Sequence, residues 1–240
     1  MPSHKPNAII FGAGHGIGLS IAKKLLASHN VFATYRVKSK AHELLAIEGL
    51  NSAQLDPLNE NDLSSYSNQF KDIKVDLIIN SIGALEVGSS PEKSFRSIDL
   101  ETMKEMFCIN AFITPLIAKH FYKTFSKESQ SVLATLSAMV GSIEDNKIGG
   151  WYSYRASKTA LNMFNKNISN ELSLLRIPCK VLSIHPGTTE TELSEKYLKG
   201  VKHTVWSPDD TASHILDVIE NHKKYDSGAF VNWDGAVLPW

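Results

Sequence analysis

Residues Ala8–Gly18, Ala-Ile-Ile-Phe-Gly-Ala-Gly-His-Gly-Ile-Gly, decide the fold of this chain. The apolar start predicts a buried first strand, and it is too short for a signal peptide. Gly12, Gly16 and Gly18 fit the spacing G-x-x-x-G-x-G, whereas G-x-G-x-x-G fails because Ile17 stands at its last position. The Walker pattern fails too, since no Gly-Lys-Ser/Thr follows. A strand, a glycine turn and a helix in this order predict a site for a pyrophosphate at the helix N-terminus, against the alternative of a purely structural turn.

The rest of the chain alternates short apolar runs with longer amphipathic ones. The expected strands are Ala8–Phe11, Val31–Thr34, Ser52–Leu55, Val75–Asn80, Ser131–Ser137, Lys180–His185 and Ala229–Asn232. The expected helices are Ile17–Ser28, Lys40–Ile47, Glu60–Gln69, Leu100–Phe125, Trp151–Leu175 and Pro208–His222. This alternation predicts an α/β fold: one doubly wound, Rossmann-like domain over residues 1–240, with a seven-stranded parallel sheet between helices. The segments that follow its strands should then meet at one edge of the sheet.

Composition limits the partners of the chain. Its 240 residues include 25 basic and 25 acidic side chains, and this balance argues against nucleic acid or an anionic membrane as the main partner. No apolar run approaches the roughly 18 residues that a membrane span needs. Cys108 and Cys179 lie in apolar segments without metal-type spacing. We therefore expect no disulfide scaffold, no metal site and a reducing cytoplasmic location.

A tyrosine and a lysine in the second half of the chain are candidates for proton transfer. Tyr154 and Lys158 are four residues apart, so on a helix they share one face. A cation at that place lowers the pKa of a phenol and prepares it for acid–base work. Tyr152 has Ala156 at the same spacing and is assigned to the pocket rim or to packing. Taken alone, the Tyr154–Lys158 pattern is weak, because such pairs arise by chance in a chain of this composition.

Five motifs together resemble the short-chain dehydrogenase/reductase family over essentially the whole chain. They are the glycine loop, Asn80-Ser-Ile-Gly83, Asn110 in a long helix, Tyr154-x-x-x-Lys158, and Pro186-Gly187-x-x-x-Thr191. Residues 141–162 and the ending 232–240 are similar to the C-factor/sniffer-type carbonyl reductase branch. The resemblance implies reduction of a carbonyl to an alcohol, or the reverse, with a nicotinamide cofactor. A binding or signalling module that holds NADP without turnover is the alternative; epimerases and dehydratases need a further domain, for which 240 residues leave no room.

The resemblance also implies residue roles. Tyr154 would exchange the proton with the substrate oxygen, Lys158 would hold the nicotinamide ribose, and Asn110 would help to bind a water, unless it only packs between helices. The backbone near Thr189 would meet the carboxamide and the Thr191 hydroxyl would meet a phosphate. A plain turn into a helix with a threonine N-cap is the other interpretation, and both can hold together. The implied cofactor-binding set is Gly12, His15, Gly16, Ile17, Gly18, Arg36, Asp56, Asn80, Gly83, Tyr154, Lys158, Pro186, Gly187, Thr189 and Thr191.

The end of the second strand bears on which nicotinamide cofactor is used. After Phe32-Ala-Thr-Tyr comes Arg36, and no acid follows until Glu43. A carboxylate there would bind the ribose 2′-OH of NAD, whereas a cation suits the 2′-phosphate of NADP. Arg36 is the expected phosphate ligand, helped by His15, or else a solvated surface charge. Asp56 would contact adenine or cap the next helix, and NADPH is expected to be preferred over NADH.

The serine that should accompany the tyrosine is displaced. In the family it commonly stands three residues before the glycine equivalent to Gly141, and here that residue is Ala138. Ser137 is the preferred candidate, although a shift by one residue in a strand turns a side chain to the other face. Ser142 and the lack of any essential serine are the alternatives.

Two further expectations concern the surface. The segment from Thr191 to about Trp206 is expected to form a mobile lid over the substrate. Trp206, Tyr197 and Leu193 would line an apolar pocket or, as aromatic residues more commonly do, pack the lid or a subunit contact. The long helices carry more apolar surface than one sheet face needs, so a symmetric homodimer or homotetramer is expected.

Overall fold

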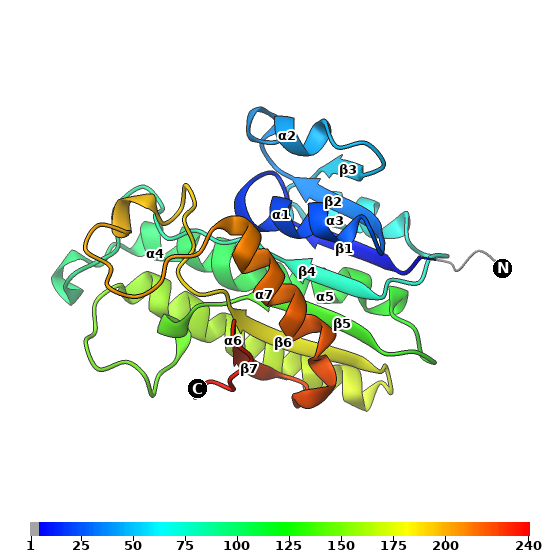
Figure 1. The fold of residues 1–240 in the computed structure, drawn as a ribbon. Coiled ribbons are helices and arrows are strands. Elements are labelled where there is room, and N and C mark those ends of the chain that lie inside the picture. The colour runs from blue at the N-terminus through cyan, green and yellow to red at the C-terminus, as the bar shows by residue number, and fades with distance from the viewer. Residues whose placement is uncertain (1–4) are drawn as a thin grey trace.

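The computed structural model describes residues 5–240 and contains a seven-stranded, fully parallel sheet (Figure 1). The strand order is β3-β2-β1-β4-β5-β6-β7. The strands are β1 Asn7–Phe11, β2 Asn30–Tyr35, β3 Asn51–Gln54, β4 Leu77–Asn80, β5 Ser131–Leu136, β6 Cys179–His185 and β7 Ala229–Asn232. The predicted doubly wound Rossmann-like fold is confirmed, and each expected strand is present within two residues of its expected bounds.

Within residues 5–240, seven α-helices connect and cover the strands. They are α1 Gly16–Leu25, α2 His42–Leu45, α3 Glu60–Asn68, α4 Leu100–Phe107, α5 Ile113–Phe121, α6 Tyr152–Leu174 and α7 Pro208–Glu220. The helix expected over Lys40–Ile47 is shorter: a 3₁₀ turn, Lys38–Lys40, precedes the four-residue α2. None of the helices within residues 5–240 has the length and apolarity needed to cross a membrane.

The single helix expected over Leu100–Phe125 is interrupted. Cys108–Phe112, between α4 and α5, is a π-helical turn, and a 3₁₀ turn, Tyr122–Thr124, follows α5. Apolar periodicity does not reveal one wide turn inside a helix, so the sequence predicted a continuous element. Such π turns occur frequently at functional sites, and this one holds Asn110.

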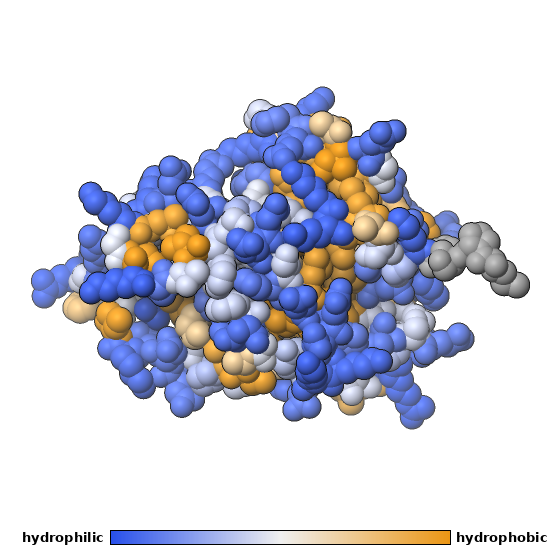
Figure 2. Space-filling view, viewed as in Figure 1, coloured by the Kyte–Doolittle hydropathy of each residue, from blue (hydrophilic) through white to orange (hydrophobic). Residues whose placement is uncertain are grey.

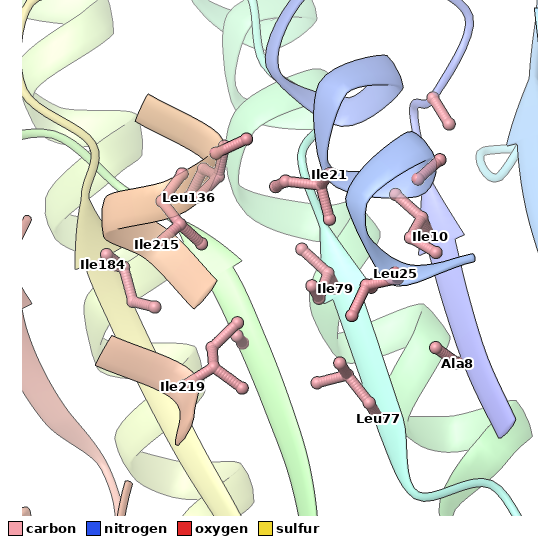
Figure 3. Packing of buried hydrophobic residues seen from close by; sticks show 14 of the residues in the cluster. Ala8, Ile10, Ile21, Leu25, Leu77, Ile79, Leu136, Ile184, Ile215 and Ile219 are labelled. Atoms are coloured by element: carbon pink, nitrogen blue, oxygen red, sulfur yellow. The ribbon is translucent and has the colours of Figure 1, made fainter. Parts of the chain in front are cut away.

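Alternation along β1 shows why both faces of the sheet need cover. Ala8 and Ile10 belong to the core beneath α1 and α7, whereas Ile9 and Phe11 belong to the opposite core beneath α3, α5 and α6. Figure 3 shows part of the first core, in which side chains from α1 and α7 lie over side chains from β1, β4, β5 and β6. These four residues of β1 are fully buried, which fixes the strand between the two helical layers.

The central strands place the glycine loop at the carboxyl edge of the sheet. β1 pairs with β4 so that Phe11 lies opposite Asn80, and the chain leaves both strands at that point. The order of the strands across the sheet changes direction between β1 and β4. From β1 the sheet continues through β2 to β3 on one side, and from β4 it continues through β5 to β7 on the other. Open α/β sheets bind their ligands at this switch point.

Candidate active site

The glycine loop between β1 and α1 is shaped by close contacts. Gly12 has φ +85°, and a Cβ on Gly18 would lie 2.4 Å from the Gly12 carbonyl oxygen and 2.4 Å from Ser81 Oγ. Two of the three motif glycines are therefore required by packing. His15, the N-cap of α1, makes no side-chain capping bond, and the first turn has no acidic residue. The N–H groups at this helix end suit an anion, so the loop fits the expected pyrophosphate.

A cavity of about 260 Å³ extends from this loop toward the ends of β2 and β3. Its lining includes the predicted cofactor residues Gly12, His15, Arg36, Asp56 and Gly83. The Arg36 side chain is exposed and makes no ion pair within residues 5–240.

Asp56 and Asn80 each make a hydrogen bond that shapes a loop at this edge. Asp56 Oδ1 accepts from Leu58 N at 3.0 Å, while Asn59 caps α3, so Asp56 forms a turn and is not the helix cap. Asn80 donates to Thr114 Oγ1 at 2.8 Å and accepts from Ile82 N at 3.1 Å, which fixes the turn after β4. Sequence reasoning did not identify Ser81, whose hydroxyl donates to Phe11 O at 2.8 Å and ties this turn to the glycine loop.

Asn110 lies where the turn after β4 meets α6. Its side chain accepts from Ala84 N and donates to Ala84 O, both at 2.8 Å, and it also donates to Ser157 Oγ at 3.2 Å. Next to it, a Cβ on Gly83 would stand 3.4 Å from Asn110 Oδ1 and 3.3 Å from Lys158 Nζ. The π turn, the loop after β4 and α6 are thus joined at one point.

Tyr154 and Lys158 share one face of α6, as their spacing predicts. Lys158 Nζ lies 5.9 Å from the centre of the Tyr154 ring and donates to Leu136 O at the end of β5, at 2.9 Å. Burial raises the pKa of the Tyr154 phenol to about 12 and lowers the pKa of the Lys158 ammonium to about 8. The sequence predicted a lowered phenol pKa, but removal from water acts against the charged form of each group.

Both candidate serines already have partners inside the protein. The Ser137 hydroxyl donates to Asn162 Oδ1 in α6 at 2.7 Å, and Ser137 is 4% exposed. Ser142 Oγ accepts from Asp145 N at 3.1 Å and is 1% exposed. Ala138 stands between β5 and a 3₁₀ turn and offers no hydroxyl. Ser137, one residue before the position where the family has its serine, therefore points toward α6 and bonds to Asn162, one helical turn after Lys158.

Glu92 organises the N-terminus of α6, and sequence reasoning missed it. Its carboxylate accepts from Ser153 N at 3.2 Å and from the Ser153 hydroxyl, and its carbonyl accepts from Trp151 N at 2.5 Å. Trp151, the N-cap, has φ +52° and makes no side-chain capping bond, so Glu92, which lies 61 positions before Ser153, supplies the cap. Nothing local signals this role, since Glu92 follows Ser-Ser-Pro in a segment that resembles an exposed loop.

The two ends of the expected lid, residues 191–206, are joined by backbone hydrogen bonds. After Pro186 and Gly187, Glu190 N donates to Trp206 O and Trp206 N donates to Thr188 O, both at 2.8 Å. We call these paired residues the neck of the lid. Thr189, 5% exposed, bonds through its hydroxyl to Thr211 of α7 at 2.8 Å. The lid is therefore a closed loop held at its base.

Aromatic residues of the lid differ in their use. The Trp206 ring packs against His214 and Trp233, with ring centres 4.7 and 5.0 Å apart, so it packs the base of the lid. Tyr197 instead lies 5.5 Å from the Trp151 ring, which lies 6.1 Å from the Tyr154 ring. Figure 2 shows an apolar patch on the surface where Figure 1 draws the lid, and Leu193 of this segment is 41% exposed.

One carboxylate holds the lid over the loop that follows β4. Glu86 accepts from Lys196 Nζ at 2.7 Å and from the Tyr197 hydroxyl. Desolvation and the bond to Glu86 raise the pKa of Tyr197 to about 12. The lid therefore closes the side of the site where Trp151 and Tyr154 lie.

A nucleotide-type glycine loop and a Tyr–Lys pair at the carboxyl edge of a parallel sheet define a class of oxidoreductases. A family model described as short chain dehydrogenase matches residues 6–202, and the chain belongs to the short-chain dehydrogenase family. An uncharacterized oxidoreductase of Schizosaccharomyces pombe is 30% identical over 253 residues, which cover 97% of this chain and 96% of that protein.

Solved structures of carbonyl reductases share the fold. The NADPH-bound carbonyl reductase from chicken fatty liver has a TM-score of 0.83 at 25% identity, with 99% of this chain and 100% of that chain covered. The carbonyl reductase Sniffer of D. melanogaster has a TM-score of 0.84 at 23% identity, with the same coverage. The resemblance to the family and its carbonyl reductase branch is confirmed.

Proposed function

We propose that this oxidoreductase reduces an aldehyde or ketone with NADPH, or catalyses the reverse reaction, using Tyr154 as the proton donor. The observation that carries the proposal is the meeting of Tyr154, Lys158 and Asn110 beside Gly83, at the sheet edge that holds the glycine loop. A carbonyl reductase of similar fold binds NADPH, which supports the same cofactor here.

The nicotinamide, when bound, supplies or accepts the hydride, and the chain supplies the proton. With a pKa of about 12, the Tyr154 phenol is protonated at neutral pH and can donate to the oxygen of the reduced carbonyl. Lys158, with a pKa of about 8, remains mostly an ammonium at pH 7. Leu136 O takes one of its three N–H donors, which leaves two for the ribose hydroxyls and a water. In this proposal, Asn110 keeps the role of holding the water site beside Lys158.

Ser137 enters the proposal as a positioning residue. Leu136 O holds Lys158 and the Ser137 hydroxyl holds Asn162, so two neighbouring residues at the end of β5 fix two successive turns of α6. This role replaces the substrate-orienting role expected from the sequence. Tyr154 therefore acts on the carbonyl oxygen without a serine hydroxyl from position 137.

Preference for NADPH rests on charge at the end of β2. Arg36 and His15 line the cavity, and β2 ends at Tyr35 without a carboxylate that would repel a 2′-phosphate. At equal concentrations NADPH should raise the melting temperature of the protein more than NADH does. Equal or reversed shifts would refute the preference.

The activity is tested by NADPH oxidation with a panel of aldehydes, ketones and quinones. Tyr154→Phe should abolish turnover and retain NADPH binding, because it removes the hydroxyl and keeps the ring. Tyr152→Phe, in the first turn of the same helix, is the matched control and should turn over normally. Near-normal turnover by Tyr154→Phe would assign proton donation to another group.

Ala138 favours one alternative, a module that binds NADP(H) without turnover. This alternative predicts that the protein binds NADPH but oxidises it with none of the substrates in the panel. The intact Tyr154–Lys158 pair argues for the enzyme.

We also retain the symmetric dimer or tetramer in the proposal. An apolar interface would require exposed apolar side chains, and three lie on neighbouring segments: Leu100 of α4 (61% exposed), Phe112 of the π turn (40%) and Met163 of α6 (61%). Light scattering after size-exclusion chromatography tests it, and a monomer at micromolar concentration would refute it.

A further inference from the structure

An ion pair joins the lid to a residue that lines the cavity. Lys40 Nζ donates to Glu192 Oε1 at 2.5 Å, and the two residues are 152 positions apart in the chain. Lys40 ends the 3₁₀ turn after β2 and lines the same cavity as Arg36 and His15. Glu192 is the second residue of the lid. The pair therefore links the lid to the part of the cavity where the basic residues gather.

Glu192 faces two basic residues of the cavity. Its pKa lies below the ordinary value, first through the hydrogen bond and charge of Lys40 and then through the charge of His15. Since His15 also lines the cavity, the carboxylate sits in a basic environment made by two separate segments. An anion is thus already held where a negatively charged ligand group would be attracted.

The start of the lid is fixed over the glycine loop. A Cβ on Gly16 would meet Thr191 Cγ2 at 3.6 Å, and Thr191 N donates to Ser194 Oγ at 3.1 Å. Together with the neck, these contacts keep Glu192 near the phosphate end of the site. The Lys40 bond is the contact by which the lid reaches across to the segment after β2.

We propose that Glu192 is a built-in competitor for the 2′-phosphate of NADP(H), which takes over Lys40 and releases that side of the lid. The inference rests on the proposed function, because it assigns the 2′-phosphate to this end of the cavity. Both partners of the pair are exposed, with side-chain exposures of 49% and 62%, so water and salt weaken the bond. A phosphate monoester carries more charge and three acceptor oxygens, so it displaces a single carboxylate.

NAD(H) lacks the group that competes with Glu192. It binds with the Lys40–Glu192 pair intact and leaves the lid attached to the segment after β2. Lys40 is then a specificity-determining residue, and the lid responds to which of the two cofactors is bound.

The test compares NADPH and NADH affinities of the wild type, Glu192→Gln and Lys40→Met by titration calorimetry. Glu192→Gln should bind NADPH about twofold to fivefold more tightly, since it loses the competing charge but keeps the side-chain shape. Lys40→Met should bind NADPH about tenfold more weakly, since it loses a charged hydrogen-bond donor. NADH affinity should change less than twofold in both variants.

A matched pair on the surface provides the control. Lys104 and Glu101 form an exposed ion pair at 2.8 Å in α4, and Lys104→Met and Glu101→Gln should leave both affinities unchanged. Hydrogen exchange of residues 191–206 is the second readout: NADPH should speed it in the wild type relative to NADH, and the difference should vanish in Glu192→Gln.

The outcomes separate this inference from the proposed function. A wild type that binds neither dinucleotide refutes the proposed function. A wild type that binds NADPH, with Glu192→Gln and Lys40→Met both unchanged in their NADPH affinity, overturns the inference alone. Equal weakening of NADPH and NADH by Lys40→Met also overturns it, because the pair would then act only by holding the lid.

Discussion

Ser137→Ala is expected to lower stability more than it lowers catalysis. The substitution removes the O–H donor that reaches Asn162 Oδ1 at 2.7 Å, in a place where Ser137 is 4% exposed and Asn162 is 2% exposed. Asn162 Nδ2 already lacks a hydrogen-bond partner within residues 5–240. After the substitution, the buried amide has no partner at either polar atom.

The magnitude follows from leaving this amide unsatisfied. An unpaired buried polar group costs about 1–3 kcal/mol, whereas the small loss of volume adds little. In a domain of this size about 1 kcal/mol shifts the melting temperature by roughly 2–4 °C. We therefore expect the melting temperature to fall by about 2–12 °C. Turnover per folded molecule should fall less than tenfold, since no substrate contact is lost.

Urea unfolding and steady-state kinetics of the same preparations measure both quantities. Ser65→Ala, on the exposed side of α3, is the matched control and should change stability by less than about 0.5 kcal/mol. A double-mutant cycle with Asn162→Ala should give a coupling energy of about 1 kcal/mol or more. Unchanged stability with a hundredfold loss of turnover would refute the reasoning and return Ser137 to the substrate.

Three other predictions concern the glycine loop and α6. Gly18→Ala should lower the free energy of unfolding by about 1–3 kcal/mol, measured with urea, because the new Cβ would lie 2.4 Å from a backbone oxygen. Gly14→Ala is the control and should lower it clearly less, since its nearest contact would be at 3.3 Å. Similar losses in the two variants would contradict the packing argument. Glu92→Ala should lower the free energy of unfolding by about 1 kcal/mol and should reduce turnover more than NADPH affinity. Glu92→Gln keeps an acceptor for Ser153 N and should recover part of the stability and part of the turnover. A Gln variant no better than the Ala variant would contradict the capping role. The pKa of Lys158 falls from 10.5 to about 8 on burial, so between pH 8 and 10 the unfolded chain binds a proton that the folded chain lacks, and stability gains with rising pH. Lys158→Met should remove this gain. The measurement is the free energy of unfolding by urea at pH 8 and at pH 10, and an equal change between the two pH values in wild type and variant would contradict the prediction.

The fold was predictable because local patterns and topology agree. Short apolar runs with amphipathic segments between them predicted the seven-stranded parallel sheet, and the strand ends predicted which loops share an edge. Tyr154 and Lys158 were predictable for the same reason, since both lie on one helix at fixed spacing. The glycine loop was predictable from the spacing of its glycines, and the structure gives the reason for two of them, which have no room for a Cβ.

The remaining features depend on contacts between distant segments. Glu92 caps α6 through Ser153, 61 positions away, and Lys40 pairs with a residue 152 positions away, and neither distance leaves a periodic signal. The π turn at Asn110 changes one hydrogen-bond register without changing which residues are apolar. Ser137 shows a different limit: its direction depends on where β5 ends, and a difference of one residue changes the partner of its hydroxyl.

The neck of the lid has a consequence for how this chain can change. Because Thr188 and Glu190 pair with Trp206, the ends of the intervening loop are joined to each other and not only to the sheet. Lengthening a loop whose ends are already fixed costs little free energy, about 0.6 kcal/mol for each doubling. Residues 191–205 therefore form an exchangeable module: a lid of another length or composition can be inserted above the same neck while the sheet, the glycine loop and α6 stay as they are.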